Sequence, residues 1–198
     1  NELEKYSLKK VSISDPEARA MQTKKKYSEL SYNSQLTTDK NQIIIANEIT
    51  QDKHDANQFI PQIKNIKENI FLNDDTKVAI DCGYSSGENI KFAEDNNLDL
   101  YVPSRAQAQV FDGKKQSLNH DNYEYDETTN EIIADGHRFS YRGMYTRKTG
   151  VKVCAFYSKE LKKKKDVPFF FKERLRMKQK MKHPYSKRVY DLRKITVE

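Results

Sequence analysis

One segment of the chain, KVAIDCGYSSGENIKFAEDNNLDLYVP at residues 77–103, constrains the fold more than any other. A short apolar run, Val78–Ile80, ends in Asp81 and a glycine-containing turn. A stretch with helical periodicity follows at 86–96, and a second apolar run at 100–102 stops before a proline. Two short strands joined through a helix predict a parallel pair. Asp81 would then stand at the carboxyl end of a strand, where open α/β sheets place their chemistry.

The residues before this segment predict two further strands and a helix. Residues 32–38 and 43–50 have β-rich composition and flank a tight-turn sequence, so they predict a hairpin. Residues 56–69 carry apolar side chains at helical spacing, with Asp55 as the predicted N-cap. A short helical turn is predicted for 14–21. The order strand, strand, helix, strand, helix, strand predicts an α/β sheet of mixed direction.

Beyond residue 103 the sequence pattern changes. Residues 104–158 lose helical periodicity, and Asp135-Gly136 between two apolar runs is a strong hairpin signal, so a small β-rich insertion is predicted. From Lys159 the pattern is typical of helices, with Val189, Leu192 and either Ile195 or Thr196 facing inward on the last one. The predicted organisation is a polar N-terminal segment at 1–31, a core at 32–103, the insertion at 104–158 and a basic helical part of the core at 159–198.

Charge is distributed unevenly along the chain. The net charge is +7, yet residues 151–198 hold 16 Lys/Arg against 5 Asp/Glu, and residues 51–100 hold 5 against 10. A basic C-terminal quarter with an acidic middle is expected of a polyanion-binding face next to a carboxylate site. The alternative is a solvated charged helix. No apolar run is long enough to span a bilayer, so no membrane partner is expected.

Three motifs occur in order over nearly the whole chain. They are Asp15-Pro16-Glu17-Ala18-Arg19 followed by Tyr32-Asn33-Ser34-Gln35, then Asp81-Cys82-Gly83-Tyr84, and finally YDLRKITVE at 190–198. Together they resemble bacterial insertion-sequence transposases of the DDE type. The resemblance implies a ribonuclease-H-like mixed sheet flanked by helices. That fold has a further strand before the hairpin, for which this chain offers no convincing candidate, so the first strand is expected to be missing.

The resemblance also implies the chemistry, which is metal-dependent DNA strand cleavage and transfer. Asp81 and Glu198 match the second and third of the family's three metal-binding carboxylates. The expected cofactor is Mg²⁺ or Mn²⁺, because carboxylates hold hard cations and two such ions can stabilise both oxygens of an in-line displacement. The expected partner is DNA, both terminal inverted repeats and target. The side chains expected to contact it are Tyr190, Arg193, Lys194, Lys163 and Lys164.

Each of these residues also has a plainer interpretation. Asp81 could simply cap a turn, and Glu198 could be a solvated terminal carboxylate. Tyr190 could be core packing, Arg193 a surface ion pair, and the lysine run a solvated tract. A non-catalytic nucleic-acid-binding remnant that uses only its basic helices is therefore a second hypothesis. An ordinary ribonuclease-H-like nuclease is a third, against which the Tyr-Asn-Ser-Gln and Tyr-x-x-Arg motifs argue.

The first catalytic aspartate of the family has no visible counterpart in residues 1–31, where Asp15 belongs to the Asp-Pro element. The sequence therefore predicts a truncated transposase that by itself neither cleaves nor joins DNA. The resemblance leaves room for a homodimer of the full-length protein. It implies a cytoplasmic, nucleoid-associated bacterial protein.

Overall fold

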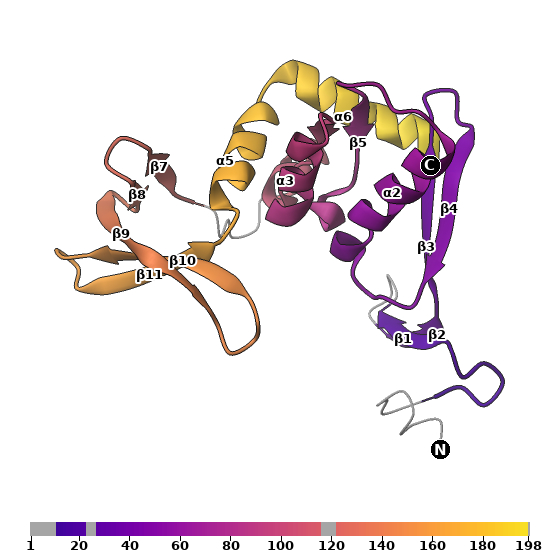
Figure 1. The fold of residues 1–198 in the computed structure, drawn as a ribbon, viewed down its shortest axis with the longest axis horizontal. Coiled ribbons are helices and arrows are strands. Elements are labelled where there is room, and N and C mark those ends of the chain that lie inside the picture. Colours follow the sequence, from indigo (N-terminus) through magenta and orange to yellow (C-terminus); the bar gives the residue numbers. More distant parts are fainter. Residues whose placement is uncertain (1–10, 23–26, 116–121, 198) are drawn as a thin grey trace. The chain divides into compact units, whose positions relative to one another are not determined.

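The computed structural model describes residues 11–22, 27–115 and 122–197 and has a mixed α/β composition (Figure 1). The chain divides into two compact units. The first comprises Asn1–Leu72 with Lys194–Glu198, and the second comprises Asn73–Arg193.

The first unit contains two antiparallel hairpins and a helix. Their bounds are β1 (Arg19–Gln22), β2 (Ser28–Ser31), β3 (Asn33–Thr38), β4 (Ile44–Thr50), a 3-10 turn (Asp55–Asn57) and α2 (Phe59–Asn69). The predicted hairpin is confirmed by β3 and β4. Its turn is closed by the Asp39 carboxylate, which accepts hydrogen bonds from the backbone N–H groups of Asn41 (2.8 Å) and Ile43 (2.9 Å).

Two local predictions in this unit are wrong. The helical turn expected up to Met21 is replaced by β1, because the Arg19 guanidinium occupies the carbonyls of Pro16 (2.9 Å) and Glu17 (2.7 Å) that a helix would need. Asp55 is not the N-cap of α2. Its carboxylate instead accepts the side-chain amide of Asn33 at 2.9 Å, so it joins the helix entry to β3.

The second unit begins with the predicted strand–helix–strand segment. Strands β5 (Lys77–Ala79) and β6 (Asp99–Tyr101) are parallel and are connected through α3 (Gly87–Asp95). The short helix α4 (Arg105–Phe111) follows, in a region for which no helix was predicted. In the described residues β3–β4 and β5–β6 form separate two-stranded ladders, so a single mixed sheet stays a prediction.

The middle part of the second unit's sequence forms a five-stranded antiparallel sheet. In chain order its strands are β7 (Glu124–Asp126), β8 (Glu131–Ala134), β9 (His137–Thr146), β10 (Lys152–Ser158) and β11 (Lys163–Pro168). The Asp135-Gly136 hairpin is confirmed, with both residues at positive φ (51° and 78°). The prediction of helix from residue 159 is wrong for residues 159–168, since β11 pairs with β10 throughout, and it is confirmed only from Phe171 onward.

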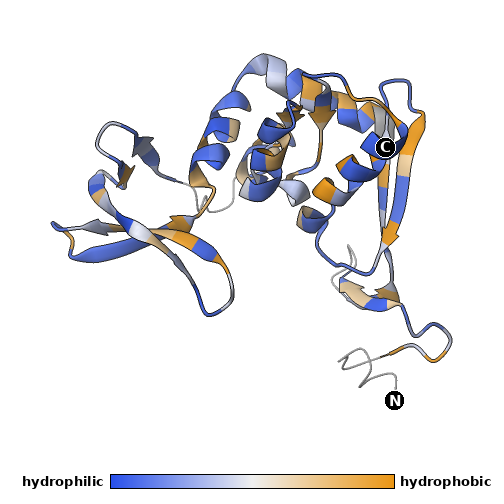
Figure 2. Ribbon diagram, viewed as in Figure 1, coloured by the Kyte–Doolittle hydropathy of each residue, from blue (hydrophilic) through white to orange (hydrophobic). Residues whose placement is uncertain are grey.

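The physical reason for β11 is tertiary. Val167, only 2% exposed, packs beside Cys154 and Phe156 in the core of the sheet, although most of the strand is hydrophilic (Figure 2). A lysine-rich strand at the edge of a sheet also discourages pairing with another chain.

Two helices complete the chain, α5 (Phe171–Lys180) and α6 (Pro184–Val197). On α6 the buried positions are Ser186 and Tyr190, one helical turn apart, whereas Leu192 is 58% exposed. Val189 is only partly buried. The predicted inward face was therefore wrong for Leu192 and also for Ile195, which is 66% exposed. The sequence pattern did not single out Ser186, whose small polar side chain is nevertheless buried.

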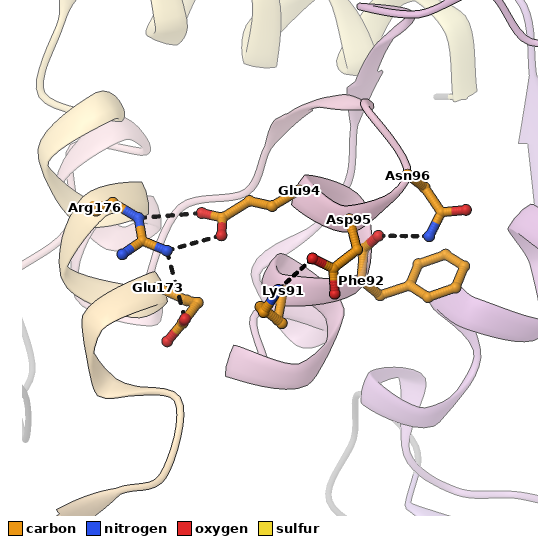
Figure 3. Close-up of polar contacts among 7 residues, drawn as sticks. All are labelled: Lys91, Phe92, Glu94, Asp95, Asn96, Glu173 and Arg176. Carbon is orange, nitrogen blue, oxygen red and sulfur yellow. Dashed lines mark hydrogen bonds and ion pairs between the residues drawn. The ribbon is translucent and has the colours of Figure 1, made fainter.

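Helices α3 and α5 are held together by a polar clamp and a close backbone approach. Arg176 donates two hydrogen bonds to the Glu94 carboxylate, at 2.8 and 3.3 Å, and one to Glu173 (Figure 3). At the first residue of α3, Gly87 lies against Phe170 so closely that a Cβ there would stand 2.3 Å from the Phe170 Cβ. These contacts fix α3, and with it the turn that carries Asp81.

Candidate active site

Asp81 stands directly beyond β5, at the carboxyl end of the parallel pair. The Ile80 N–H donates to the Tyr101 carbonyl at 3.2 Å, which extends the ladder to the residue before Asp81. The Asp81 backbone is extended (φ −69°, ψ 158°), and its Oδ1 accepts the Cys82 N–H at 2.6 Å. The carboxylate is thus fixed on a rigid edge and is exposed to solvent.

The turn after Asp81 is closed by local hydrogen bonds. The Ser86 hydroxyl caps α3 by accepting the Asn89 N–H at 3.1 Å, and the buried Asn89 side chain donates to the Tyr84 carbonyl at 2.9 Å. Ser86 and Asn89 therefore hold the loop to the helix. The consequence is a preorganised position for Asp81.

Tyr190 brings α6 onto this edge. Its ring is 2% exposed and packs on Phe111 of α4, with the ring centroids 5.9 Å apart. Its hydroxyl makes a long hydrogen bond of 3.4 Å to Asp81 Oδ1, and it accepts a bond of 3.0 Å from Arg193 Nη2. The Arg193 guanidinium also lies 4.7 Å from the Tyr190 ring centroid. Arg193, Tyr190 and Asp81 thus form one connected series.

Burial raises the pKa of Tyr190 to about 12. The charge of Arg193 acts to lower this pKa, and the charge of Asp81 acts to raise it. The phenol is therefore neutral at physiological pH and remains a hydrogen-bond donor. Burial, followed by the charge of Asp81, also raises the pKa of the Cys82 thiol. Cys82 is consequently not an activated nucleophile, because the thiolate is the reactive form.

The sequence argument did not single out Arg105, the exposed first residue of α4, whose charge opposes the rise of the Cys82 thiol's pKa. The signal that could have revealed it is the Pro103-Ser104 pair after the second apolar run, since Ser104 begins α4 with a capping box to Gln107.

The structure brings together only some of the predicted site residues. Asp81, Tyr190 and Arg193 are joined, as described above. Lys194 is half-buried near the end of α6 and belongs to the first unit, and Glu198 lies outside the described residues. Within the part of the chain that the structure describes, no group of three or more His, Cys, Asp or Glu is placed to hold a metal ion.

Lys163 and Lys164 do not form a single phosphate-binding pair. They are neighbours on β11, opposite Ser158 and Tyr157 respectively, so their side chains project from opposite faces of the sheet. Lys164 forms an ion pair with Asp166 at 3.2 Å.

The motifs of the first unit have structural roles. The Tyr32 hydroxyl donates to Asp15 at 2.9 Å, which fastens the Asp-Pro turn to the start of β3. Gln35 is 3% exposed and donates to Asn33 at 2.9 Å and to Asp55 at 3.2 Å. Asn33 and Gln35 of this motif thus build a part-buried amide network with Asp55 within this unit.

Comparison with known proteins decides the family. A model of the family described as transposase DDE domain matches residues 10–189. The chain belongs to this family. No curated protein and no solved structure matches it. This transposase-domain protein is thereby placed among DNA-processing enzymes that act in transposition and recombination and that generally use divalent metal ions. The match ends one residue before Tyr190, so the final motif is additional to it. In the described residues no helix is long and apolar enough to cross a membrane.

Proposed function

We propose that Asp81 is a metal-binding carboxylate of a DDE transposase with a ribonuclease-H-like core, acting in DNA strand cleavage and transfer. The observation that supports this most directly is the attachment of the Tyr190–Arg193 pair to the carboxylate at the end of β5. The carboxylate thereby has a partner 109 positions further along the chain, Tyr190, which in turn holds Arg193.

The chemistry of Asp81 suits a hard divalent cation such as Mg²⁺ or Mn²⁺. The carboxylate is exposed, and its bonds to Cys82 and Tyr190 both end on Oδ1. We propose that Glu198 supplies a second ligand. Bound ions would stabilise the charge on the attacking and leaving oxygens of the phosphodiester.

The chain's own residues would position the reacting groups. The neutral Tyr190 phenol donates to Asp81 and so orients its carboxylate. Two arginines would supply positive charge for a DNA phosphate next to the carboxylate, namely Arg193, which the Tyr190 hydroxyl holds, and Arg105. Lys194 from the last turn of α6 would do the same. Lys163 and Lys164 would contact DNA from the sheet.

We propose in addition that this polypeptide alone neither cleaves nor joins DNA. The reaction of this class needs three carboxylates, and only Asp81 and Glu198 match the family's motifs in this sequence. Mg²⁺-dependent nicking of plasmid DNA by the polypeptide, abolished by Asp81→Asn, would contradict this part of the proposal.

Metal binding tests the site itself. Titration with Mn²⁺, followed by the electron paramagnetic resonance of the free ion, should give at least about tenfold weaker binding for Asp81→Asn and for Glu198→Gln. Asp135→Asn is the matched control, because Asp135 sits in a hairpin turn at φ 51°, a conformation that asparagine adopts readily. Unchanged Mn²⁺ affinity in Asp81→Asn would refute the assignment. If DNA binding then persisted, it would favour the non-catalytic nucleic-acid-binding hypothesis.

A further inference from the structure

Phe111, the last residue of α4, packs against two side chains on one face of α6. Its ring centroid lies 5.9 Å from that of Tyr190, with the two ring planes tilted by 49°, and 5.7 Å from Lys187 Nζ. Lys187 and Tyr190 are three positions apart, so they are neighbours on the surface of the helix. Phe111 therefore fixes the rotation of α6 about its axis at the turn that carries Tyr190.

The position of Phe111 is in turn fixed by the start of α4. The helix begins directly after β6 and Pro103, and its capping box joins Ser104 to Gln107 by hydrogen bonds of 3.3 and 3.2 Å. The Gln107 side chain also donates to the Lys178 carbonyl of α5 at 2.9 Å. The short helix α4 is thus anchored to β6 and to α5 before its last residue reaches Tyr190.

Both strands of the parallel pair therefore lead to the Tyr190 hydroxyl. From β5 the connection runs through Asp81, whose Oδ1 lies 3.4 Å from the hydroxyl, and from β6 it runs through α4 and Phe111. Hydrogen bonds between oxygens usually measure about 2.5–3.0 Å, so this one is already long and a small displacement of the ring would break it. The Phe111 contact is placed to prevent that displacement.

The other group that covers the Tyr190 ring cannot take this role. The Arg193 guanidinium lies 4.7 Å from the ring centroid, but Arg193 belongs to α6 itself and would move together with Tyr190. Phe111 reaches the ring from a separate, anchored helix. It is therefore suited to set where the Tyr190 hydroxyl stands relative to Asp81.

A second aromatic contact of α6 provides an internal comparison. In the first turn of the helix, Tyr185 packs edge-on against Tyr101 of β6, with the ring centroids 6.3 Å apart. Tyr185 and Tyr190 are five positions apart, which is about 140° around the helix axis. The Tyr185 contact therefore attaches α6 to β6 at a different face and turn from the one that meets Asp81.

We propose that Phe111 is a positioning residue of the metal site. It holds the Tyr190 ring so that the hydroxyl stays on Asp81 Oδ1, and the carboxylate thereby keeps the orientation in which it binds a divalent cation. The inference rests on the proposed function in taking Asp81 as a metal ligand. It adds a residue outside the three sequence motifs, which acts on the metal only through Tyr190.

Mn²⁺ titration, followed by the electron paramagnetic resonance of the free ion, tests the proposal. Residues that hydrogen-bond to a metal ligand contribute about 10–100-fold to metal affinity, so Tyr190→Phe should weaken binding by about tenfold. Phe111→Ala should weaken it by a similar factor, because the hydroxyl then leaves the carboxylate. Phe111→Tyr keeps the ring and should bind Mn²⁺ as the wild type does. Normal affinity in Phe111→Ala would refute the proposal.

The double variant Phe111→Ala/Tyr190→Phe shows whether Phe111 acts through Tyr190. Residues that act through one another have non-additive effects, whereas independent losses of affinity multiply. The double variant should therefore bind about tenfold more weakly than the wild type, as Tyr190→Phe does, and not about 100-fold more weakly. A loss equal to the product of the two single losses would overturn the proposal.

Tyr185→Ala is the matched control, because it removes an aromatic contact of the same helix. It should lower the melting temperature in EDTA but leave the Mn²⁺ affinity unchanged, whereas Phe111→Ala should lower both. Equal losses of Mn²⁺ affinity in the two variants would contradict the proposal, since any loosening of α6 would then suffice. If circular dichroism shows that Phe111→Ala does not fold, Phe111→Leu, which keeps most of the apolar volume without the ring, takes its place.

The Asp81→Asn protein separates this inference from the proposed function. Weakened Mn²⁺ binding in Asp81→Asn together with normal binding in the Phe111 variants overturns the positioning role alone. Normal Mn²⁺ binding in Asp81→Asn overturns the metal site itself, and the positioning role with it.

Discussion

Replacement of Gly87 by alanine should destabilise the second unit through a single misplaced methyl group. Gly87 is the buried first residue of α3, and its φ lies outside the left-handed region, so alanine is permitted by the backbone. The new Cβ would stand 2.3 Å from the Phe170 Cβ and 3.0 Å from the Phe170 carbonyl oxygen. Neither atom is the end of a flexible side chain, so α3 or the start of α5 must move.

The size of the effect follows from two opposing contributions. Overpacking of this kind costs about 1–3 kcal/mol. Alanine is favoured over glycine in a helix by at most about 1 kcal/mol, and by less at the first position. A net loss of about 1–2 kcal/mol is expected, which for a chain of this length lowers the melting temperature by about 2–8 °C.

Thermal and urea unfolding followed by circular dichroism at 222 nm measures this loss. Glu88→Ala, at the exposed neighbouring position, is the control and should change stability by less than about 0.5 kcal/mol. Phe170→Gly removes the atom in closest conflict, so the double variant should be more stable than the sum of the single effects predicts. A Gly87→Ala protein that melts at or above the wild-type temperature would refute the packing argument.

Three further predictions concern polar contacts. Tyr190→Phe should cost only about 0.5–1.5 kcal/mol, because it removes hydrogen bonds but keeps the buried ring, whereas Tyr190→Ala should cost about 3–5 kcal/mol. Lys180→Met should cost about 1–2 kcal/mol, since Lys180 donates to Asp99 at 2.5 Å and to the buried Leu100 carbonyl at 2.7 Å. Asp166→Asn should flatten the acid side of the stability–pH curve. Burial acts to raise the pKa of Asp166, but hydrogen bonds from Tyr145, Arg147 and Lys164 outweigh burial and lower the pKa below 3.8. The ionised carboxylate therefore adds to the free energy of unfolding above that pH, and this contribution is lost as the pH falls below it.

Each of these has its own control and its own contrary result. For Tyr190, equal losses in the phenylalanine and alanine variants would show that the ring is not packed as described. Lys182→Met, at an exposed position just beyond α5, should leave stability unchanged and so isolates the contacts of Lys180. For Asp166, urea midpoints that fall equally steeply in wild type and Asp166→Asn as the pH is lowered below about 4 would contradict the pKa argument.

Sequence patterning anticipated those elements whose signals are local. The β3–β4 hairpin, the strand–helix–strand segment around Asp81 and the Asp-Gly turn were each predicted from residues that touch one another in the folded chain. It missed β11, because Lys163–Asp166 has no apolar alternation and becomes a strand only through pairing with β10. It misassigned Asp55, whose partners Asn33 and Gln35 lie more than 19 positions earlier.

The sequence by itself determined the family and the position of Asp81 at a strand end, because short-range motifs and hydrophobic spacing carry that information. Only the tertiary structure decided that Tyr190 reaches Asp81 and holds Arg193, and that Lys163 and Lys164 face opposite ways. The physical reason is that these relations depend on the packing of α6 on α4 and on strand register. Both arise from contacts between residues far apart in the chain, which no local pattern encodes.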